Sequence, residues 1–331
     1  MTESDANRTG QTRAARLRPL LSMALILLAV LGVAFAVRGV PMDVLGEIRL
    51  RIIPWWTFPL IAFLQLLFLL LAADIWRRVV TVTTGTGITL WSSYLQLAVV
   101  AIGKYVPGKV WGFVARAGEM YRQRIPVHLS VSSSIVEQVL VLAGAILIAV
   151  IAALFALPDY RIATTIIGLL LVIATGIASS RIPGLTRWMM RRNGIDGGAG
   201  QIARLRARDI FGIVFSYTVL WLLSGLTFAA IYYSLFDAPI TLEGVSALTL
   251  GNTAGIVLGF FAFFVPGGIG VREAVATFVL SGFVPIREAL LAAVCYRGWL
   301  VLIDALNALL ILGREAAAAR REPVRGDERA R

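Results

Sequence analysis

The sequence predicts an all-α, polytopic integral membrane protein, a bundle of helices that cross the bilayer. Of its 331 residues 58% are hydrophobic and only 15% are charged, which is more apolar surface than a water-soluble chain can bury. Apolar runs recur along the chain, and a helix needs about 20 such residues to cross the hydrocarbon core. We expect one transmembrane domain over residues 19–312, between charged cytoplasmic tails at 1–18 and 313–331, of which the second is expected to be frayed.

Six apolar runs are long enough to be predicted as full spans. They lie at about 19–37, 55–75, 128–157, 162–180, 209–235 and 287–312. The first run imitates a secretory signal peptide, because Ala34 and Ala36 precede Arg38. Either it is cleaved or it is a retained first helix, and we interpret it as retained.

Two further apolar segments, at about 89–126 and 244–285, are interrupted by Pro107-Gly108 and by Pro266-Gly267. Proline removes a helical hydrogen bond, and glycine leaves the backbone free. At membrane depth such breaks are tolerated only inside protein or beside a watery cavity. We therefore expect two broken, re-entrant hairpins, which makes about eight or more membrane segments. Kinked helix pairs that serve only packing are the alternative.

The two interrupted segments form an internal repeat. Tyr105 to Gly108 corresponds to Phe264 to Gly267, and Pro126 corresponds to Pro285, at a constant offset of 159. The repeat cores cover about 89–157 and 244–312. Three predicted crossings, an odd number, separate the hairpins, so the second copy is predicted to be inverted. Inverted repeats with broken helices are typical of secondary transporters, which bind substrate at the repeat interface.

The net charge of +12 comes mostly from arginines at the ends of apolar runs. They concentrate in the two tails and in the linker 181–208, whereas the loop 236–243 is acidic. The positive-inside rule then places both termini in the cytoplasm and the protein in the cell inner (cytoplasmic) membrane. Three arginines of the first outer loop conflict mildly with this. The pattern indicates contact with anionic headgroups rather than nucleic acid.

Several of these residues carry a family resemblance. The segment KYVPGKVWG at 104–112 is followed by Arg116 and Glu137, and PGGIGVRE occupies 266–273. In these motifs, and over about 15–312, the chain resembles the lysylphosphatidylglycerol synthase transmembrane-region family. This is the flippase-like membrane domain of multiple-peptide-resistance proteins. The resemblance implies a translocator-like module for anionic or lipid-linked headgroups. Bifunctional relatives append an aminoacyl-transferase domain, which we do not expect here, so lysyl transfer is not carried over.

Ionisable residues at membrane depth are candidates for function. The predicted substrate-binding residues are Lys104, Lys109, Arg116, Glu137, Gly267, Gly268, Gly270, Arg272, Glu273, Arg297 and Asp304. Glu137 shares one helical face with Ser130, Ser133 and Ser134. That stripe is either a headgroup path with a proton-coupled carboxylate or an interhelical hydrogen-bond cluster.

The remaining candidates also have two interpretations each. Arg297 and Asp304 are seven residues apart and share a helical face, so they pair with each other, or Arg297 instead faces Glu137 or binds an anionic headgroup. Gly267, Gly268 and Gly270 precede a predicted half-helix, whose free N–H groups and dipole favour an anion, unless Glu273 only caps that start. Lys104, Lys109 and Arg116 have the matching role in the first repeat or are ordinary positive-inside charge.

Other features suggest no chemistry. Gly251, Gly255 and Gly259 form a close-packing face, within or between monomers. The segment 103–109 nearly matches a phosphate-binding loop, but Val110 replaces the required Ser or Thr, so we expect no ATPase. One cysteine and one histidine supply neither a disulfide nor a metal site, and no cofactor is expected.

The leading hypothesis is a flippase-like transporter, not an enzyme, that moves an anionic phospholipid or a lipid-linked sugar phosphate across the cytoplasmic membrane. Arg116, Arg272 and Arg297 would hold the headgroup. The partners would be anionic or polyprenyl-phosphate-linked lipids, with a homo-oligomer or an envelope-synthesis enzyme as further candidates. The alternative is a non-transporting membrane partner of an envelope lipid- or glycan-modifying enzyme. A membrane-embedded lipid enzyme is disfavoured, because the sequence shows no nucleophile–base pair or metal set.

Overall fold

The computed structural model describes residues 54–105, 110–192, 207–262, 265–268 and 270–321, and within them all regular structure is helical. The predicted all-α class is confirmed. The elements are α3 Thr57–Thr84, α4 Leu90–Gly103, α5 Trp111–Arg122, α6 Val127–Ala156, η1 Pro158–Tyr160, α7 Arg161–Arg192, α9 Ala207–Leu235, α10 Leu242–Phe261, η2 Pro266–Gly268, α11 Val271–Leu280 and α12 Ile286–Arg321. The predicted span 19–37 lies outside the described residues.

Five described helices are long and apolar enough to cross a membrane, namely α3, α6, α9, α10 and the part of α12 up to Arg314. The chain is therefore a multi-pass membrane protein. Helix α7 covers the predicted run 162–180 and continues to Arg192. Helix α10 was predicted as the first arm of a re-entrant hairpin. Its 20 residues are enough to cross by length, since the chain breaks only after Phe261, so the re-entrant hairpin stays a prediction.

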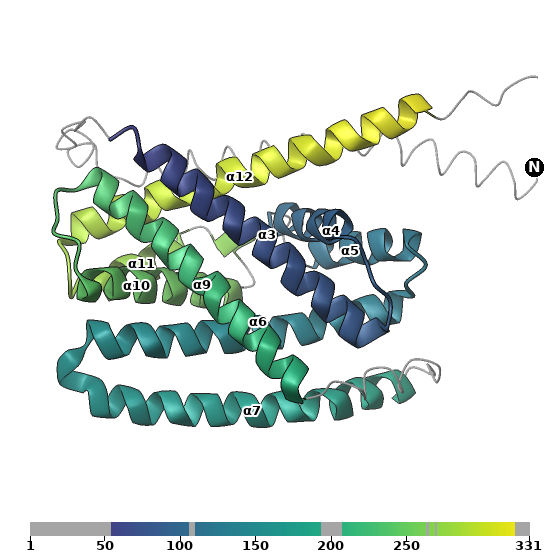
Figure 1. The fold of residues 1–331 in the computed structure, drawn as a ribbon, viewed down its shortest axis with the longest axis horizontal. Helices are drawn as coiled ribbons and strands as arrows, with labels where there is room; N and C mark the ends of the chain where they lie inside the picture. The colour runs from purple at the N-terminus through teal and green to yellow at the C-terminus, as the bar shows by residue number, and fades with distance from the viewer. Residues whose placement is uncertain (1–53, 106–109, 193–206, 263–264, 269, 322–331) are drawn as a thin grey trace, which may run out of the picture.

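The first interrupted segment is a short helical hairpin made of α4 and α5 (Figure 1). These helices have 14 and 12 residues, which correspond to about 21 and 18 Å against a hydrocarbon core of about 30 Å. A Cβ atom on Gly103 would lie 2.2 Å from the Cα atom of Gly112. The two backbones therefore cross at a contact that only glycine permits. This hairpin is too short to cross the membrane, as its interruption predicts.

The second interrupted segment pairs α10 with the ten-residue helix α11. The glycine face of α10 lies against α11. A Cβ atom would lie 2.7 Å from Leu280 Cγ at Gly251, 2.6 Å from the Arg272 carbonyl oxygen at Gly255 and 2.3 Å from Arg272 Cγ at Gly259. The predicted close-packing face is confirmed, and it serves packing within the chain. Because the arms of the two hairpins differ in length, the inverted repeat stays a prediction.

The two hairpins lie at opposite ends of the bundle, with α4 and α5 at one end and α10 and α11 at the other (Figure 1). The long helices run between these ends. Two apolar clusters fill the interior, one around Trp76, Met120 and Leu140 and one around Phe228 and Leu280.

The described part of the C-terminal tail is helical. Helix α12 continues through residues 313–321, which were expected to be frayed. The segment from Glu315 to Arg321 consists of alanine, glutamate and arginine, which have high helix propensity. Arg314 also contacts Glu119 of α5 at 3.2 Å. Local propensity and this ion pair extend the helix beyond the apolar run.

Candidate functional site

The tips of the two hairpins touch. The backbone N–H of Gly267, in the turn between α10 and α11, donates to the carbonyl oxygen of Lys104 at the end of α4, at 2.9 Å. Gly267 belongs to the predicted Pro266-Gly267 break, and Lys104 lies shortly before the predicted Pro107-Gly108 break, which is outside the described residues. A backbone group of one hairpin therefore finds its partner in the other hairpin.

The turn before α11 depends on glycine. Gly267, Gly268 and Gly270 have φ angles of 61°, 68° and 82°, a region that other L-residues adopt only at a cost. Their N–H groups are all occupied, because Gly268 donates to the Val265 carbonyl at 3.0 Å and Gly270 donates to Glu273 Oε2 at 2.7 Å. The capping interpretation of Glu273 is confirmed, and the N–H groups of these three glycines are already occupied. An anion at the start of the half-helix stays a prediction.

Helix α12 adds a second set of contacts at this junction. Lys104 Nζ lies 2.6 Å from Asp304 Oδ2, and the Tyr105 hydroxyl donates to the same carboxylate at 2.7 Å. Arg297 Nη2 donates to the Gly267 carbonyl at 3.1 Å. Neither predicted pairing of Arg297, with Asp304 or with Glu137, forms. The tertiary structure explains this, because each hairpin places a different charged residue beside α12. Lys104 comes from the first hairpin and Glu273 from the second.

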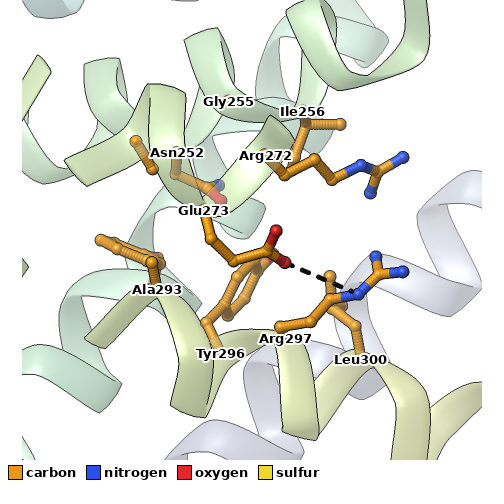
Figure 2. A pocket seen from close by; sticks show the side chains of 11 residues that line it. Asn252, Gly255, Ile256, Arg272, Glu273, Ala293, Tyr296, Arg297 and Leu300 are labelled. Carbon is orange, nitrogen blue, oxygen red and sulfur yellow. Dashed lines mark ion pairs between the residues drawn. The ribbon is translucent and has the colours of Figure 1, made fainter. Parts of the chain in front are cut away.

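Arg272 and Arg297 flank the glycine turn with their guanidinium groups on the same side of Glu273 (Figure 2). Glu273 Oε1 lies 3.8 Å from Arg297 Nε, which makes a loose ion pair without a hydrogen bond. Arg272 Nε and Arg297 Nη1 are buried, and neither has a hydrogen-bond partner among the described residues. Buried donors of this kind are costly when unpaired, so they are suited to an acceptor from outside the chain.

The glycines also leave room for the two arginine side chains. A Cβ atom on Gly267 would lie 2.8 Å from Arg297 Nη2, and one on Gly268 would lie 3.0 Å from Arg272 Nε. Any larger side chain in the turn would displace the guanidinium groups. The predicted glycines therefore act on the site by leaving room for the arginines and not through their N–H groups.

Arg116 and Glu137 form a separate, fully enclosed ion pair between α5 and α6. The Arg116 guanidinium stacks on the Trp76 ring at 4.0 Å, a cation–π contact, and its Nε reaches the Gln96 carbonyl oxygen at 3.4 Å. The sequence analysis did not predict Trp76 or Gln96, although polar groups inside apolar runs are the signal that could have revealed them. Glu137 thus neutralises Arg116 in this structure.

The serine stripe beside Glu137 is buried and mostly occupied within the protein. Ser133 shares a hydrogen bond with Thr83 of α3 at 2.6 Å, and Ser134 accepts from Arg116 at 3.4 Å. For these two serines the structure supports the interhelical hydrogen-bond cluster. Ser130 Oγ is buried and has no partner among the described residues.

A cavity of about 330 Å³ connects these groups. Its charged lining comprises Lys104, Arg116, Glu137, Arg272 and Asp304. Apolar and aromatic residues of α3, α4, α6, α9 and α12 form much of the remaining wall, which also includes polar residues such as Gln65, Gln138 and Asn307. A smaller cavity of about 20 Å³, lined by Arg272, Glu273 and Arg297, lies next to it. Lys109, also predicted as a ligand, lies outside the described residues.

The charged cavity lies inside a bundle of long apolar helices, which is the arrangement of a polytopic α-helical membrane protein. The chain belongs to the family described as Lysylphosphatidylglycerol synthase TM region, whose model matches residues 20–306. The family confirms the resemblance found in the sequence and links the chain to membrane lipid-related function. The comparison with curated proteins gave no match, and the comparison with solved structures gave none either.

Proposed function

We propose that the chain is a flippase-like transporter of an anionic phospholipid or a lipid-linked sugar phosphate across the cytoplasmic membrane. The headgroup enters the cavity between the two hairpins, and the lipid tail stays in the bilayer. The observation that carries this proposal is the pair of buried arginine donors without partners, Arg272 Nε and Arg297 Nη1, beside a cavity large enough for a headgroup. Guanidinium groups bind phosphate oxygens with well-defined geometry.

The arrangement of the hairpins supports movement rather than static binding. Among the described residues, the tips meet through one backbone hydrogen bond, from Gly267 to Lys104, and the hairpins approach from opposite ends of the bundle. In transporters built from inverted repeats, one repeat moves against the other around a central site. The 159-residue offset between the two breaks is consistent with such a pair. The cytoplasmic orientation of both termini is part of this proposal.

The acidic residues have a gating role in this proposal. Asp304 holds Lys104 at 2.6 Å and Tyr105 at 2.7 Å, and so ties the first hairpin to α12. An incoming phosphate competes with Asp304 for Lys104 and loosens that tie. Glu137 neutralises Arg116 until a ligand or a proton replaces one partner. Transport is then downhill or coupled to an ion.

Purified protein in liposomes tests the proposal. The assay follows phosphatidylglycerol with a fluorescent acyl chain, and an impermeant reductant reports how fast the inner-leaflet label becomes accessible. Wild type is expected to accelerate this exchange, and Arg272→Ala and Arg297→Ala are expected to lower the rate at least about tenfold, because each removes a charge-assisted phosphate contact. Arg161→Ala is the control, since Arg161 is exposed at the start of α7.

Unchanged rates in both site variants would overturn the assignment of the site. Wild-type protein that moves neither this lipid nor a lipid-linked sugar phosphate would overturn the transporter itself. Stable co-purification with an envelope lipid- or glycan-modifying enzyme would then favour the non-transporting partner.

A further inference from the structure

The charges around the two adjoining cavities do not balance. Among the described residues that line them there are four cations, Lys104, Arg116, Arg272 and Arg297, and three carboxylates, Glu137, Glu273 and Asp304. The described lining therefore carries one excess positive charge. This excess lies at membrane depth, where an uncompensated charge is costly.

The excess can be assigned to one side chain. Lys104 pairs with Asp304, Arg116 pairs with Glu137, and Arg297 pairs loosely with Glu273. Arg272 has no ion pair within 4.0 Å in the described part of the chain, and its Nε is buried without an acceptor. It lines both cavities. Its missing partner is therefore an anion that occupies the space between them.

We infer that the site takes a phosphodiester carrying a single negative charge, and that it discriminates against phosphate monoesters and diphosphates. This rests on the proposed function and narrows its substrate class. One negative charge neutralises Arg272. A second negative charge would have no unpaired cation to neutralise it among the described lining residues. Glycerophospholipids with a neutral headgroup and polyprenyl-phosphate sugars are diesters. Polyprenyl monophosphates are monoesters.

The size of the cavity agrees with this class. Its volume of about 330 Å³ is near the lower end of the range of ligand pockets, about 300–1,000 Å³. Much of its wall is apolar, including Leu97, Leu220 and Ile303. One phosphate with a compact substituent fits this space, whereas a diphosphate with an oligosaccharide needs more room and more cations.

The test uses two ligands with the same tail and different charge, farnesyl phosphate and its methyl ester. Calorimetry measures their dissociation constants for the full chain in detergent. At about pH 8 the methyl ester is expected to bind at least about tenfold more tightly, because the monoester is then a dianion. At about pH 5.5 most of the monoester has taken up one proton and carries a single negative charge, since its second pKa is about 6. The ratio of the two dissociation constants is then expected to fall below about twofold. The methyl ester keeps its charge at both pH values, so its own change in affinity corrects for titration of the protein.

Variants change the charge of the site by one. Asp304→Asn adds one positive charge and is expected to reduce or reverse the preference for the methyl ester at about pH 8. Arg272→Gln removes the unpaired charge instead and should weaken binding of the methyl ester at least about tenfold. Because no ion pair of the described residues is broken, it replaces Asp304→Asn if that variant does not fold. Asp74→Asn is the control, because Asp74 pairs with exposed Arg77 and Arg78 away from the site. Its ratio is expected to match wild type.

The outcomes separate the two proposals. Tighter binding of the monoester at about pH 8, or a ratio independent of pH, would overturn the single-charge assignment and leave the transporter intact. Binding of neither ligand, with lipid movement still present in liposomes, would also overturn the inferred class. Failure of both binding and lipid movement would remove the proposed function.

Discussion

The backbone N–H of Gly267 donates to the carbonyl oxygen of Lys104 at 2.9 Å. These residues belong to different hairpins, which approach one another from opposite ends of the bundle. The contact joins the end of α4 to the glycine turn before α11. Around it lie Tyr105, Arg297 and Asp304, so a change at either tip is expected to affect the other.

Gly267→Ala tests the turn. At a φ of 61° an alanine costs about 1–2 kcal/mol, and its Cβ atom would also lie 2.8 Å from Arg297 Nη2. We expect lower thermal stability in detergent together with weaker ligand binding. Gly270→Ala, at a φ of 82° but with open space around its Cβ position, should show the backbone cost alone. Gly87→Ala is the control, and a loss there as large as at Gly267 would contradict the prediction.

Gly255→Ala tests the contact between α10 and α11. The new Cβ atom would lie 2.6 Å from the carbonyl oxygen of Arg272, so the backbone of α11 must shift. The expected destabilisation is about 1–3 kcal/mol, and transport should fall because Arg272 moves with its helix. Gly212→Ala in α9 has open space, and it is expected to leave stability unchanged or raise it by up to about 1 kcal/mol. Equal behaviour of the two variants in a thermal unfolding assay would count against this packing.

Glu137→Gln tests the enclosed ion pair. Arg116 has an exposed side-chain fraction of 1%, so removal of its carboxylate leaves a buried charge and should cost about 3–5 kcal/mol. Adding Arg116→Met should recover part of that loss, because the uncompensated charge is gone. Asp74→Asn at the surface should cost about 0–1 kcal/mol. Additive effects of the two site substitutions in thermal unfolding would show that the residues are not coupled.

The orientation of the hairpins can be tested with single cysteines in a Cys295→Ser background. Gly87 precedes α4 and Gly282 follows α11, and both are exposed. With both termini in the cytoplasm, an impermeant maleimide should label Gly282→Cys in intact cells. It should label Gly87→Cys only after permeabilisation. Labelling of both positions from the same side would contradict the opposed arrangement.

Local chemistry was sufficient to predict the helices and their breaks. Pro107 and Pro266 mark the interruptions in the sequence, and the glycines at 251, 255 and 259 mark a packing face. Glu273 caps α11, as one of its two interpretations predicted. All of these depend on neighbours in the chain or on a helical period. The same local reasoning did not detect that α10 is long enough to cross, because a hairpin was inferred from the break alone.

The charge partners could not be predicted in this way. Helical spacing suggested that Arg297 and Asp304 pair with each other, yet each pairs with a residue of a hairpin tip, Glu273 or Lys104. Those contacts depend on how two distant segments meet, and no spacing within α12 contains that information. That Arg272 has no ion pair among the described residues became visible only when the charges of the described lining could be compared.

The hydrogen bond between the Gly267 N–H and the Lys104 carbonyl oxygen also makes the separation of the hairpin tips measurable by hydrogen exchange. An amide hydrogen that donates inside a folded protein exchanges with deuterium only when its bond opens. The Gly267 amide can exchange only when the hairpin tips part, so its exchange rate measures how often the two halves of the chain separate. A bound ligand that ties the tips together should slow that exchange, and one that drives them apart should speed it.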